Sequence, residues 1–302
     1  MKLMKPSQAF LGLDEADSVN YGKAKAVIIP FGLEKSVSYF GGTKKGPKAM
    51  IKASHEVELF DEELWCEPFR DMGIVTLKEP RITKNLPKAL SQLEKLVEEV
   101  LNAGKFPFVF GGEHSITAGA IRPFSRKYDD LVILHFDAHA DLRDGYEGEY
   151  YSHASALRRC LDDKNVKNEG KQIKLVSCGI RNISAEEIPF LESNKKRIKI
   201  YFAKDKENWD ISEITSYLKG KSIYITCDVD GFDASVMPAT GTPEPGGLYW
   251  NDVIKIISKT SQIANIVGAD INELSPIKGF HSCDFLAAKL AYKILSLSFF
   301  NK

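Results

Sequence analysis

Three potential metal ligands alternate along one short stretch of the chain: Asp137, His139 and Asp141. The stretch, residues 132–141, has the sequence VILHFDAHAD, an apolar run that ends in carboxylates and an imidazole. Successive side chains of an extended segment point to opposite sides, so these three share one side. A second apolar run ends in CDVD at 227–230, where two aspartates alternate in the same way. Two strand ends of this kind predict one shared metal site, and the number of ligands favours two ions.

A third apolar run also ends in polar residues. Residues 106–110, FPFVF, lead into GGEHS, which contains His114. Ligands of an open parallel sheet bind beyond the carboxyl ends of the strands, so we expect the three ends to meet at one edge. A lone D-x-D or a lone histidine is more often a capping or structural group, but three such strand ends together favour a metal site. The candidate ligands are His114, Asp137, His139, Asp141, Asp228 and Asp230.

The charges of this ligand set indicate its chemistry. Four carboxylates that converge in a partly buried cleft repel each other and take up protons unless cations neutralise them. Two divalent cations would do so, and oxygen ligands with some nitrogen suit manganese better than a structural zinc, with iron, cobalt and nickel left open. Asp137 and Asp228, one from each strand, are best placed to bridge both ions. Because two ions can bring the pKa of a shared water towards ~7, the residues indicate a binuclear metallohydrolase.

Two neighbours of the ligands are assigned to the interior of the sheet instead. Cys227 directly precedes Asp228, so its side chain should point to the opposite side of the strand. His135 shares the side of Asp137 but lies deeper in the apolar run, and we expect it to support a ligand or to pack in the core. The five cysteines of the chain show no pairing pattern and indicate reduced thiols.

Strands that alternate with helices must position these ligands. Near-continuous apolar runs predict strands that are buried on both faces. The predicted strands are 25–30, 72–77, 106–110, 131–137, 173–179, 198–203, 222–228 and 265–271. The predicted helices are 46–60, 85–103, 114–127, 153–163, 184–193, 210–219, 250–260 and 282–298. This order predicts an α/β fold, a three-layer αβα domain with a central, mostly parallel sheet of about eight strands. In the absence of a linker or a repeat, we expect a single domain over 1–302, with 238–247 (PATGTPEPGG) as an active-site loop.

The bulk properties of the chain exclude several classes of protein. Its 302 residues contain 43% apolar residues, enough for a large core and too many for disorder. The 41 basic and 41 acidic residues give zero net charge, which argues against a nucleic-acid partner. The first residues, MKLMKPSQAF, lack the apolar region of a signal peptide, and no apolar run approaches ~20 residues, so we expect no membrane partner and a cytoplasmic protein.

At these residues the chain resembles the arginase/agmatinase (ureohydrolase) family, and is most similar to the prokaryotic agmatinases. The resemblance covers nearly the full chain. Its motifs are specific, because all six ligand types occur in order and in the family's contexts. The segments that carry it are SYFGGTKKGPKAM at 38–50, GGEHS at 111–115, FDAHADLRD at 136–144, SHAS at 152–155, CDVDGFD at 227–233, PATGTPEPGG at 238–247 and DINELSP at 270–276. Ala234-Ser235 stands where the family often has proline, which affects only the stiffness of the loop.

The resemblance implies two Mn²⁺ per subunit and hydrolysis of a guanidinium group to urea and an amine by a metal-bridging hydroxide. One ion would take His114, Asp137, Asp141 and Asp228, and the other Asp137, His139, Asp228 and Asp230. Asp141 would also orient the hydroxide. His153 matches the family's proton-shuttle histidine, a task that suits an ordinary pKa near ~6.5. Glu273 matches the glutamate that grips the guanidinium through two N–H bonds, and Thr242 is a weaker candidate for a substrate contact.

The loop 142–153, LRDGYEGEYYSH, bears on the substrate. It lacks the Asn/Ser/Thr-rich run with which arginases hold the head of arginine, and it offers Asp144, Glu147 and Glu149 instead. Acidic groups suit the cationic amine of agmatine, so the prediction is hydrolysis of agmatine to putrescine and urea, a step of polyamine biosynthesis. A cation at Arg143 would favour a carboxylate tail, but we expect Arg143 to point away into an ion pair.

Two alternatives remain open. The chain could be another ureohydrolase, acting on guanidinobutyrate, guanidinopropionate or arginine. A catalytically silent binding homologue is the more remote alternative, because such relatives usually lose ligands and all six are present here. The expected partner is therefore a small cationic guanidino substrate, and the family implies a homo-oligomer, a trimer or hexamer.

Overall fold

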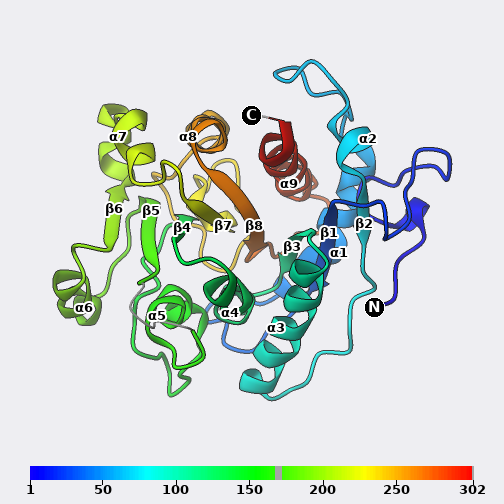
Figure 1. The fold of residues 1–302 in the computed structure, drawn as a ribbon. Helices are drawn as coiled ribbons and strands as arrows, with labels where there is room; N and C mark the ends of the chain where they lie inside the picture. Colours follow the sequence, from blue (N-terminus) through cyan, green and yellow to red (C-terminus); the bar gives the residue numbers. More distant parts are fainter. Residues whose placement is uncertain (167–171, 301–302) are drawn as a thin grey trace.

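One sheet of parallel strands forms the centre of the molecule (Figure 1). The computed structural model describes residues 1–166 and 172–300. Within these residues the sheet has eight strands in the order β2-β1-β3-β8-β7-β4-β5-β6, and every pairing is parallel. The strands are β1 Ala26–Phe31, β2 Ile74–Thr76, β3 Phe106–Gly111, β4 Leu131–Phe136, β5 Lys174–Ile180, β6 Ile198–Phe202, β7 Ser222–Asp228 and β8 Asn265–Asn272. All eight predicted strands are confirmed, with small shifts at their ends.

Helices cover both faces of the sheet, which confirms the predicted three-layer αβα fold. One apolar core lies between the sheet and α1, α2, α7, α8 and α9, and a second lies between the sheet and α3, α4 and α5. Figure 1 shows α7, α8 and α9 on one side and α3, α4 and α5 on the other. The helices are α1 Gly46–Ala53, α2 Pro68–Met72, α3 Leu86–Asn102, α4 Ile116–Lys127, α5 Ala156–Asp162, α6 Ile188–Ser193, α7 Ile211–Ser216, α8 Trp250–Ile263 and α9 Ser282–Phe300.

The helix α3 illustrates how local sequence fixes an element. The side chain of Asn85 accepts a hydrogen bond from the backbone N–H of Lys88 at 3.0 Å, which caps the first turn. Leu90, Leu93 and Val97 bury one face of the helix. The helix stops before Gly104, whose φ of +71° suits glycine.

The helix α1 ends earlier than predicted, at Ala53 instead of residue 60. The hydroxyl of Ser54 donates to the carbonyl of Ile51 at 2.7 Å and accepts from the backbone N–H of Leu11 at 2.8 Å. Ser54 thus binds a segment that is remote in sequence, and a short 3₁₀ turn, Ser54–Glu56, replaces the last predicted turns. The short helix α2 was not predicted.

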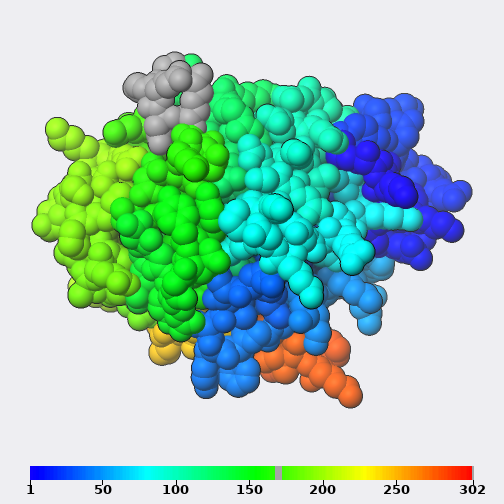
Figure 2. Space-filling model, turned by 90° about the horizontal axis from the view of Figure 1, so that it is seen from below, coloured from blue at the N-terminus to red at the C-terminus, as the bar shows by residue number. Residues whose placement is uncertain are grey.

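The topology brings the polar strand ends together. The strands β3, β8, β7 and β4 are consecutive neighbours in the sheet. Their last residues and the segments that follow them contain the candidate ligands and Glu273, so four strand ends meet at one edge, one more than the three ends expected. Figure 2 shows how the segment before α1, drawn in blue, lies beside the green segment around α5, in line with the hydrogen bond from His153 to Ser36 at 2.9 Å.

The predictions about the cysteines and about membrane spans can also be compared with the structure. All five cysteines are free, and Cys227 packs in the apolar core on the side away from the ligands. No helix within residues 1–166 and 172–300 combines the length and the apolar character needed to cross a membrane.

Candidate metal centre

The imidazole of His114 lies at the centre of a ring of carboxylates. Its Nδ1 atom is 3.0 Å from Asp141 Oδ2, 3.2 Å from Asp137 Oδ2 and 3.5 Å from Asp228 Oδ2. His114 and Asp137 are at most 1% exposed. One imidazole nitrogen therefore faces three carboxylates from the ends of two other strands.

A second group of ligands adjoins the first. His139 Nδ1 is 3.1 Å from Asp230 Oδ2 and 3.6 Å from Asp137 Oδ1. Atoms of Asp137, His139 and Asp230 lie within 4.8 Å of one another, a spacing that could hold a metal ion. Asp137 belongs to both groups, which is the geometry that a bridging carboxylate needs. All six predicted ligands thus come together at one edge of the sheet.

The electrostatics of the cluster fit divalent cations. Burial, followed by repulsion from Asp230 and Asp137, holds the pKa of Asp228 well above its usual range. Burial and the charge of Asp137 raise the pKa of Asp141 to about 6. His114 Nδ1 is buried and lacks a hydrogen-bond partner among the described residues. A partnerless nitrogen beside crowded carboxylates is the donor set that a metal ion would satisfy.

A chain of hydrogen bonds orients His114. Thr226 Oγ1 donates to Asp270 Oδ1 at 2.6 Å, so it can only accept from His114 Nε2, which lies 2.9 Å away. The proton of the ring therefore sits on Nε2, and Nδ1 keeps its lone pair towards the carboxylates. Asp270 is fully buried and also accepts from Tyr224 at 2.6 Å, which fixes it in place.

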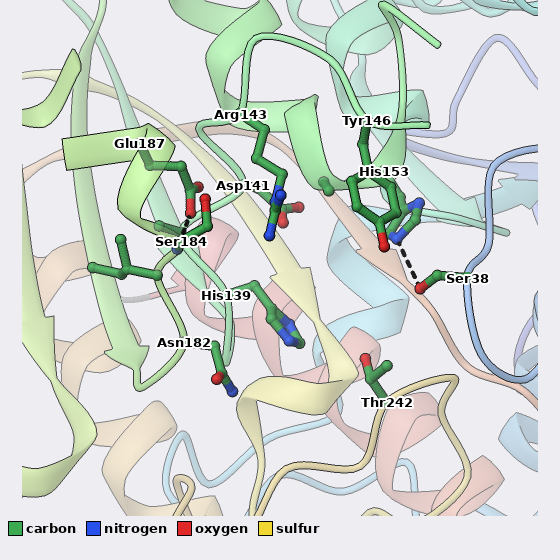
Figure 3. Close-up of a pocket in the computed structure, with 13 residues that line it drawn as sticks. Ser38, His139, Asp141, Arg143, Tyr146, His153, Asn182, Ser184, Glu187 and Thr242 are labelled. Atoms are coloured by element: carbon green, nitrogen blue, oxygen red, sulfur yellow. Dashed lines mark hydrogen bonds between the residues drawn. The ribbon is translucent and has the colours of Figure 1, made fainter. Parts of the chain in front are cut away.

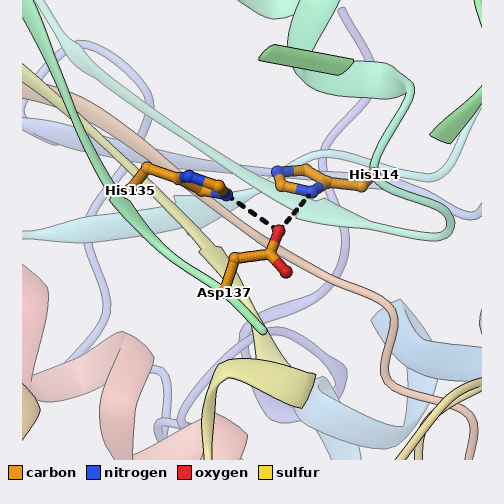
Figure 4. A group of neighbouring side chains, drawn as sticks. All are labelled: His114, His135 and Asp137. Atoms are coloured by element: carbon orange, nitrogen blue, oxygen red, sulfur yellow. Dashed lines mark hydrogen bonds and ion pairs between the residues drawn. The ribbon is translucent and has the colours of Figure 1, made fainter. Parts of the chain in front are cut away.

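His135 supports a ligand, one of the two roles expected for it. Its Nε2 atom lies 2.8 Å from Asp137 Oδ2, and its Nδ1 atom lies 3.0 Å from Ser177 Oγ. Figure 4 shows the rings of His135 and His114 on either side of the Asp137 carboxylate. Although burial alone would raise the pKa of Asp137, the neighbouring histidines, with His135 first, hold it well below its usual range.

Two site residues, the candidate ligand Asp141 and Glu273, have unusual backbone conformations. Asp141 has a φ of +53° and Glu273 a φ of +64°, in the left-handed region that non-glycine residues seldom adopt. The strand β4 ends at Phe136, so residues 137–141 are not the regular extended segment that the alternation predicted. Such strain persists at functional sites because the surrounding structure holds it.

His153 stands at the wall of the site. Ser36 Oγ is 3.3 Å from its Nδ1 atom and accepts its backbone N–H at 2.9 Å, and Ser38 Oγ is 3.5 Å from its Nε2 atom. Ser36 is itself held by Glu113, which accepts its hydroxyl at 2.8 Å. Burial, followed by the positive charge of His139, lowers the pKa of His153 to about 4.

Glu273 binds the backbone of the loop after β3. Its Oε1 atom accepts the backbone N–H of His114 at 2.6 Å, and the residue is 7% exposed. Burial and the charge of Glu113 hold its pKa well above the usual range. One carboxylate oxygen is thus committed to the loop after β3, which leaves the other for a further partner.

A cavity of about 290 Å³ opens onto the cluster (Figure 3). Among the predicted site residues, His139, Asp141, His153 and Thr242 line it. Thr242 Oγ1 donates to Asp230 Oδ2 at 3.4 Å, so it reaches the metal ligands directly. The further polar residues that line it are Ser38, Arg143, Tyr146, Asn182, Ser184 and Glu187.

The structure corrects two expectations about the loop 142–153. Arg143 does form an ion pair, with Glu186, but it lines the cavity instead of pointing away. Asp144, Glu147 and Glu149 are absent from the cavity wall, and Asp144 pairs with Arg159 at 2.5 Å. The acidic residue of the neighbouring segment that lines the cavity is Glu187, which sequence reasoning missed. Its segment follows β5, the strand after β4 in the sheet, and a polar strand end there was the available signal.

Known proteins share this fold and sequence. The Arginase family model matches residues 24–296. The N(1)-aminopropylagmatine ureohydrolase of Synechocystis sp. is 34% identical over 294 residues, which cover 94% of this chain and 92% of the relative. The agmatinase of Bacillus anthracis is 31% identical over 263 residues, 85% of this chain and 86% of the relative.

A solved structure agrees with these relatives. The agmatine ureohydrolase of Thermoplasma volcanium superposes with a TM-score of 0.82 at 30% identity, covering 96% of this chain and 94% of that chain. The fold, the match to the family model and the hydrolase relatives all indicate the same family. The chain is a hydrolase that belongs to the arginase family of ureohydrolases.

Proposed function

We propose that this ureohydrolase cleaves agmatine to putrescine and urea with two Mn²⁺ ions per subunit. The observation that carries the proposal is the buried nitrogen of His114, which faces three carboxylates at one end of a cavity lined by His153 and Thr242. The agmatinase of Bacillus anthracis and the agmatine ureohydrolase of Thermoplasma volcanium, at 31% and 30% identity, support agmatine as the substrate.

The six ligands divide between two ions. His114 and Asp141 would hold one, and His139 and Asp230 the other, with Asp137 and Asp228 shared. When bound, two divalent cations activate a water for attack at neutral pH. The pKa values of Asp228 and Asp141 are raised, so positive charge beside these two carboxylates would favour their ionised forms.

The residues around the ligands would bind the guanidinium and move the proton. The free oxygen of Glu273 can accept N–H groups of the planar guanidinium. Burial lowers the pKa of His153, so its imidazole quickly releases any proton that it takes up. It can therefore pass a proton to the leaving amine, while Ser36 and Ser38 keep its ring at the cavity wall.

N(1)-aminopropylagmatine is the second candidate substrate. The N(1)-aminopropylagmatine ureohydrolase of Synechocystis sp. is 34% identical to this chain. Tyr39 and Phe40 follow Ser38 at the cavity wall, are 73% and 60% exposed, and pack edge to face with ring centroids 4.6 Å apart. Exposed aromatic faces attract alkylammonium groups, so this pair could hold the additional amine of a longer tail.

A urea-release assay tests the proposal. Protein stripped of metal and reloaded with Mn²⁺ is given agmatine, N(1)-aminopropylagmatine, guanidinobutyrate, guanidinopropionate and arginine, and the substrates are ranked by kcat/KM. We expect agmatine to rank first. A higher value for another compound would reassign the substrate, and no urea from any of them would favour a catalytically silent binding protein.

Three further points belong to this proposal. We expect residues 1–302 to act as one ureohydrolase domain, the protein to form a trimer or hexamer, and the enzyme to work in the cytoplasm in polyamine biosynthesis without nucleic-acid or membrane partners. Light scattering on the purified protein measures the assembly, and a monomer at micromolar concentration would contradict it.

A further inference from the structure

A buried carboxylate beside the site has no part in the proposed function. Glu113 lies in the loop between β3 and α4 and is 0% exposed. Its Oε2 atom accepts the backbone N–H groups of Lys35 and Ser36, the second at 2.7 Å. Its Oε1 atom accepts the hydroxyl of Ser36 at 2.8 Å and that of Ser115 at 2.6 Å. Four donors thus surround Glu113, which binds them all as an acceptor.

The hydrogen bond to Glu113 fixes the direction of the Ser36 hydroxyl. A hydroxyl has one proton, and that of Ser36 goes to Glu113, so its oxygen has only lone pairs for His153. This oxygen accepts the backbone N–H of His153 at 2.9 Å and lies 3.3 Å from Nδ1 of the ring. A bare Nδ1 would set two lone pairs against each other, whereas a protonated Nδ1 makes a hydrogen bond. The contact therefore favours the ring proton on Nδ1.

The other neighbours of the ring agree with this tautomer. Ser152 Oγ is 3.3 Å from Nδ1 and can accept from the same N–H. Ser38 Oγ is 3.5 Å from Nε2 and can donate to it. Ser38 and His153 both line the cavity, and Figure 3 shows the contact between them at the cavity wall. The nitrogen that keeps its lone pair is thus the one on the side of Ser38.

We propose that Glu113, acting through Ser36, is a positioning residue that sets the tautomer of His153. The ring proton stays on Nδ1, where Ser36 accepts it. Nε2 can then take up one proton from the cavity, form an imidazolium, and give the same proton to the leaving amine, after which the ring is neutral again. The inference rests on the proposed function and deepens it, since it names the atom of His153 that moves the proton and the carboxylate that selects this atom.

Glu113→Gln should reverse the hydrogen bond to Ser36. The amide oxygen must stay with the backbone N–H groups of Lys35 and Ser36, which can only donate, so the amide nitrogen faces the Ser36 hydroxyl and donates to it. Ser36 then turns its own proton to Nδ1, and the ring proton of His153 moves to Nε2. The ¹⁵N chemical shifts of the metal-free chain at neutral pH, with its six histidines labelled and His153→Ala for assignment, report the tautomer directly.

Ser115→Ala is the matched control. It removes the other hydroxyl that donates to Glu113 Oε1, but no contact joins Ser115 to His153 among the described residues, so the proton should stay on Nδ1. Ser36→Thr keeps the hydroxyl and should keep the proton there too. A proton on Nε2 in the unsubstituted protein, or on Nδ1 in both this protein and Glu113→Gln, would overturn the inference.

Ser36→Ala is the second variant, and it decides the matter if Glu113→Gln fails to fold. The substitution leaves Glu113 in place but removes the oxygen that faces Nδ1 at 3.3 Å. Both tautomers of His153 should then be populated. A ring proton that stays wholly on Nδ1 in Ser36→Ala would show that Ser36 does not select the tautomer.

Turnover gives an independent measurement. With Mn²⁺ and agmatine, and with rates expressed per bound metal, Glu113→Gln should lower kcat about 10- to 100-fold, part of what a positioned proton-transfer group contributes. KM should stay within about threefold. In a His153→Ala background the same substitution should change kcat by less than about twofold, because its target is gone; a purely structural role would add its full loss there. If the unsubstituted protein released no urea from any guanidino compound, the proposed function would fail, while the ¹⁵N shifts would still decide the tautomer.

Discussion

Thr226→Val is the sharpest test of how the protein prepares its metal site. The hydroxyl of Thr226 gives its proton to Asp270 at 2.6 Å and accepts the Nε2 proton of His114 at 2.9 Å. Valine has nearly the same shape but no hydroxyl. The substitution therefore removes the group that keeps the ring proton on Nε2 and leaves Nδ1 bare.

The magnitude follows from the two hydrogen bonds. Loss of a bond to a charged acceptor costs about 1.5–3 kcal/mol, and a buried donor without a partner costs about 1–3 kcal/mol. Asp270 still accepts from Tyr224, Thr117 and Asn272, which reduces the first contribution. We expect a loss of about 3 kcal/mol in the free energy of unfolding without metal. The affinity for Mn²⁺ should fall about 10- to 100-fold, as for other partners that orient a ligand.

Urea denaturation of the metal-free protein and calorimetric titration with Mn²⁺ measure the two effects. Thr260→Val is the control, because Thr260 is equally buried but its hydroxyl donates only to the helix carbonyl of Ile256 at 2.7 Å. It should cost about 1 kcal/mol and leave Mn²⁺ affinity unchanged. Thr226→Ser should recover most of the affinity. If Thr226→Val bound Mn²⁺ as tightly as Thr260→Val, the hydrogen-bonded chain would not set the tautomer of His114.

Three other substitutions probe the site and the fold. Asp228→Asn should remove a shared carboxylate and lower the affinity for both metals together, as measured by metal analysis after dialysis; two retained ions would contradict the bridging assignment. His153→Ala should keep its metal but lose about 10²- to 10⁴-fold in kcat, and NMR of the metal-free protein should show His153 titrating near pH 4. Because that pKa lies below the unfolded value, His153 favours unfolding as the pH falls from about 6.5 to 4, and His153→Ala should flatten this part of the stability curve. Lys293→Met should lower the free energy of unfolding by about 3 kcal/mol in urea denaturation. The substitution leaves the buried carboxylate of Asp61 without the Lys293 ammonium, which lies 2.9 Å away. An unchanged denaturation midpoint would contradict this expectation.

The strands could be predicted because they are buried on both faces. Val132, Leu134 and Phe136 face one core while Leu131 and Ile133 face the other, so β4 is a continuous apolar run in the sequence. The ligands could be predicted for a related reason, since polar residues at the ends of parallel strands have one common edge to occupy.

Long-range contacts decided what sequence reasoning missed. Asp144 appeared available to a substrate amine until the fold placed Arg159 beside it. Arg143 and Glu186 are 43 residues apart, and no local pattern connects them. The early end of α1 depends on the hydrogen bond from the Leu11 N–H to the Ser54 hydroxyl, which is likewise invisible in the local sequence. The positive φ of Asp141 falls in the same class, because the surrounding structure imposes it.

The place of β8 in the sheet has a consequence for how the enzyme is made. This strand comes last in the chain but pairs with β3 on one side and β7 on the other. Until it inserts, His114 and the aspartates of the other strand ends belong to two separate half-sheets. Synthesis runs from the N-terminus, so a growing chain cannot assemble the metal centre before residues 265–272 have emerged and docked. The metal ions can therefore bind only after the sheet is complete. The non-local strand pairing that completes the sheet makes folding slow.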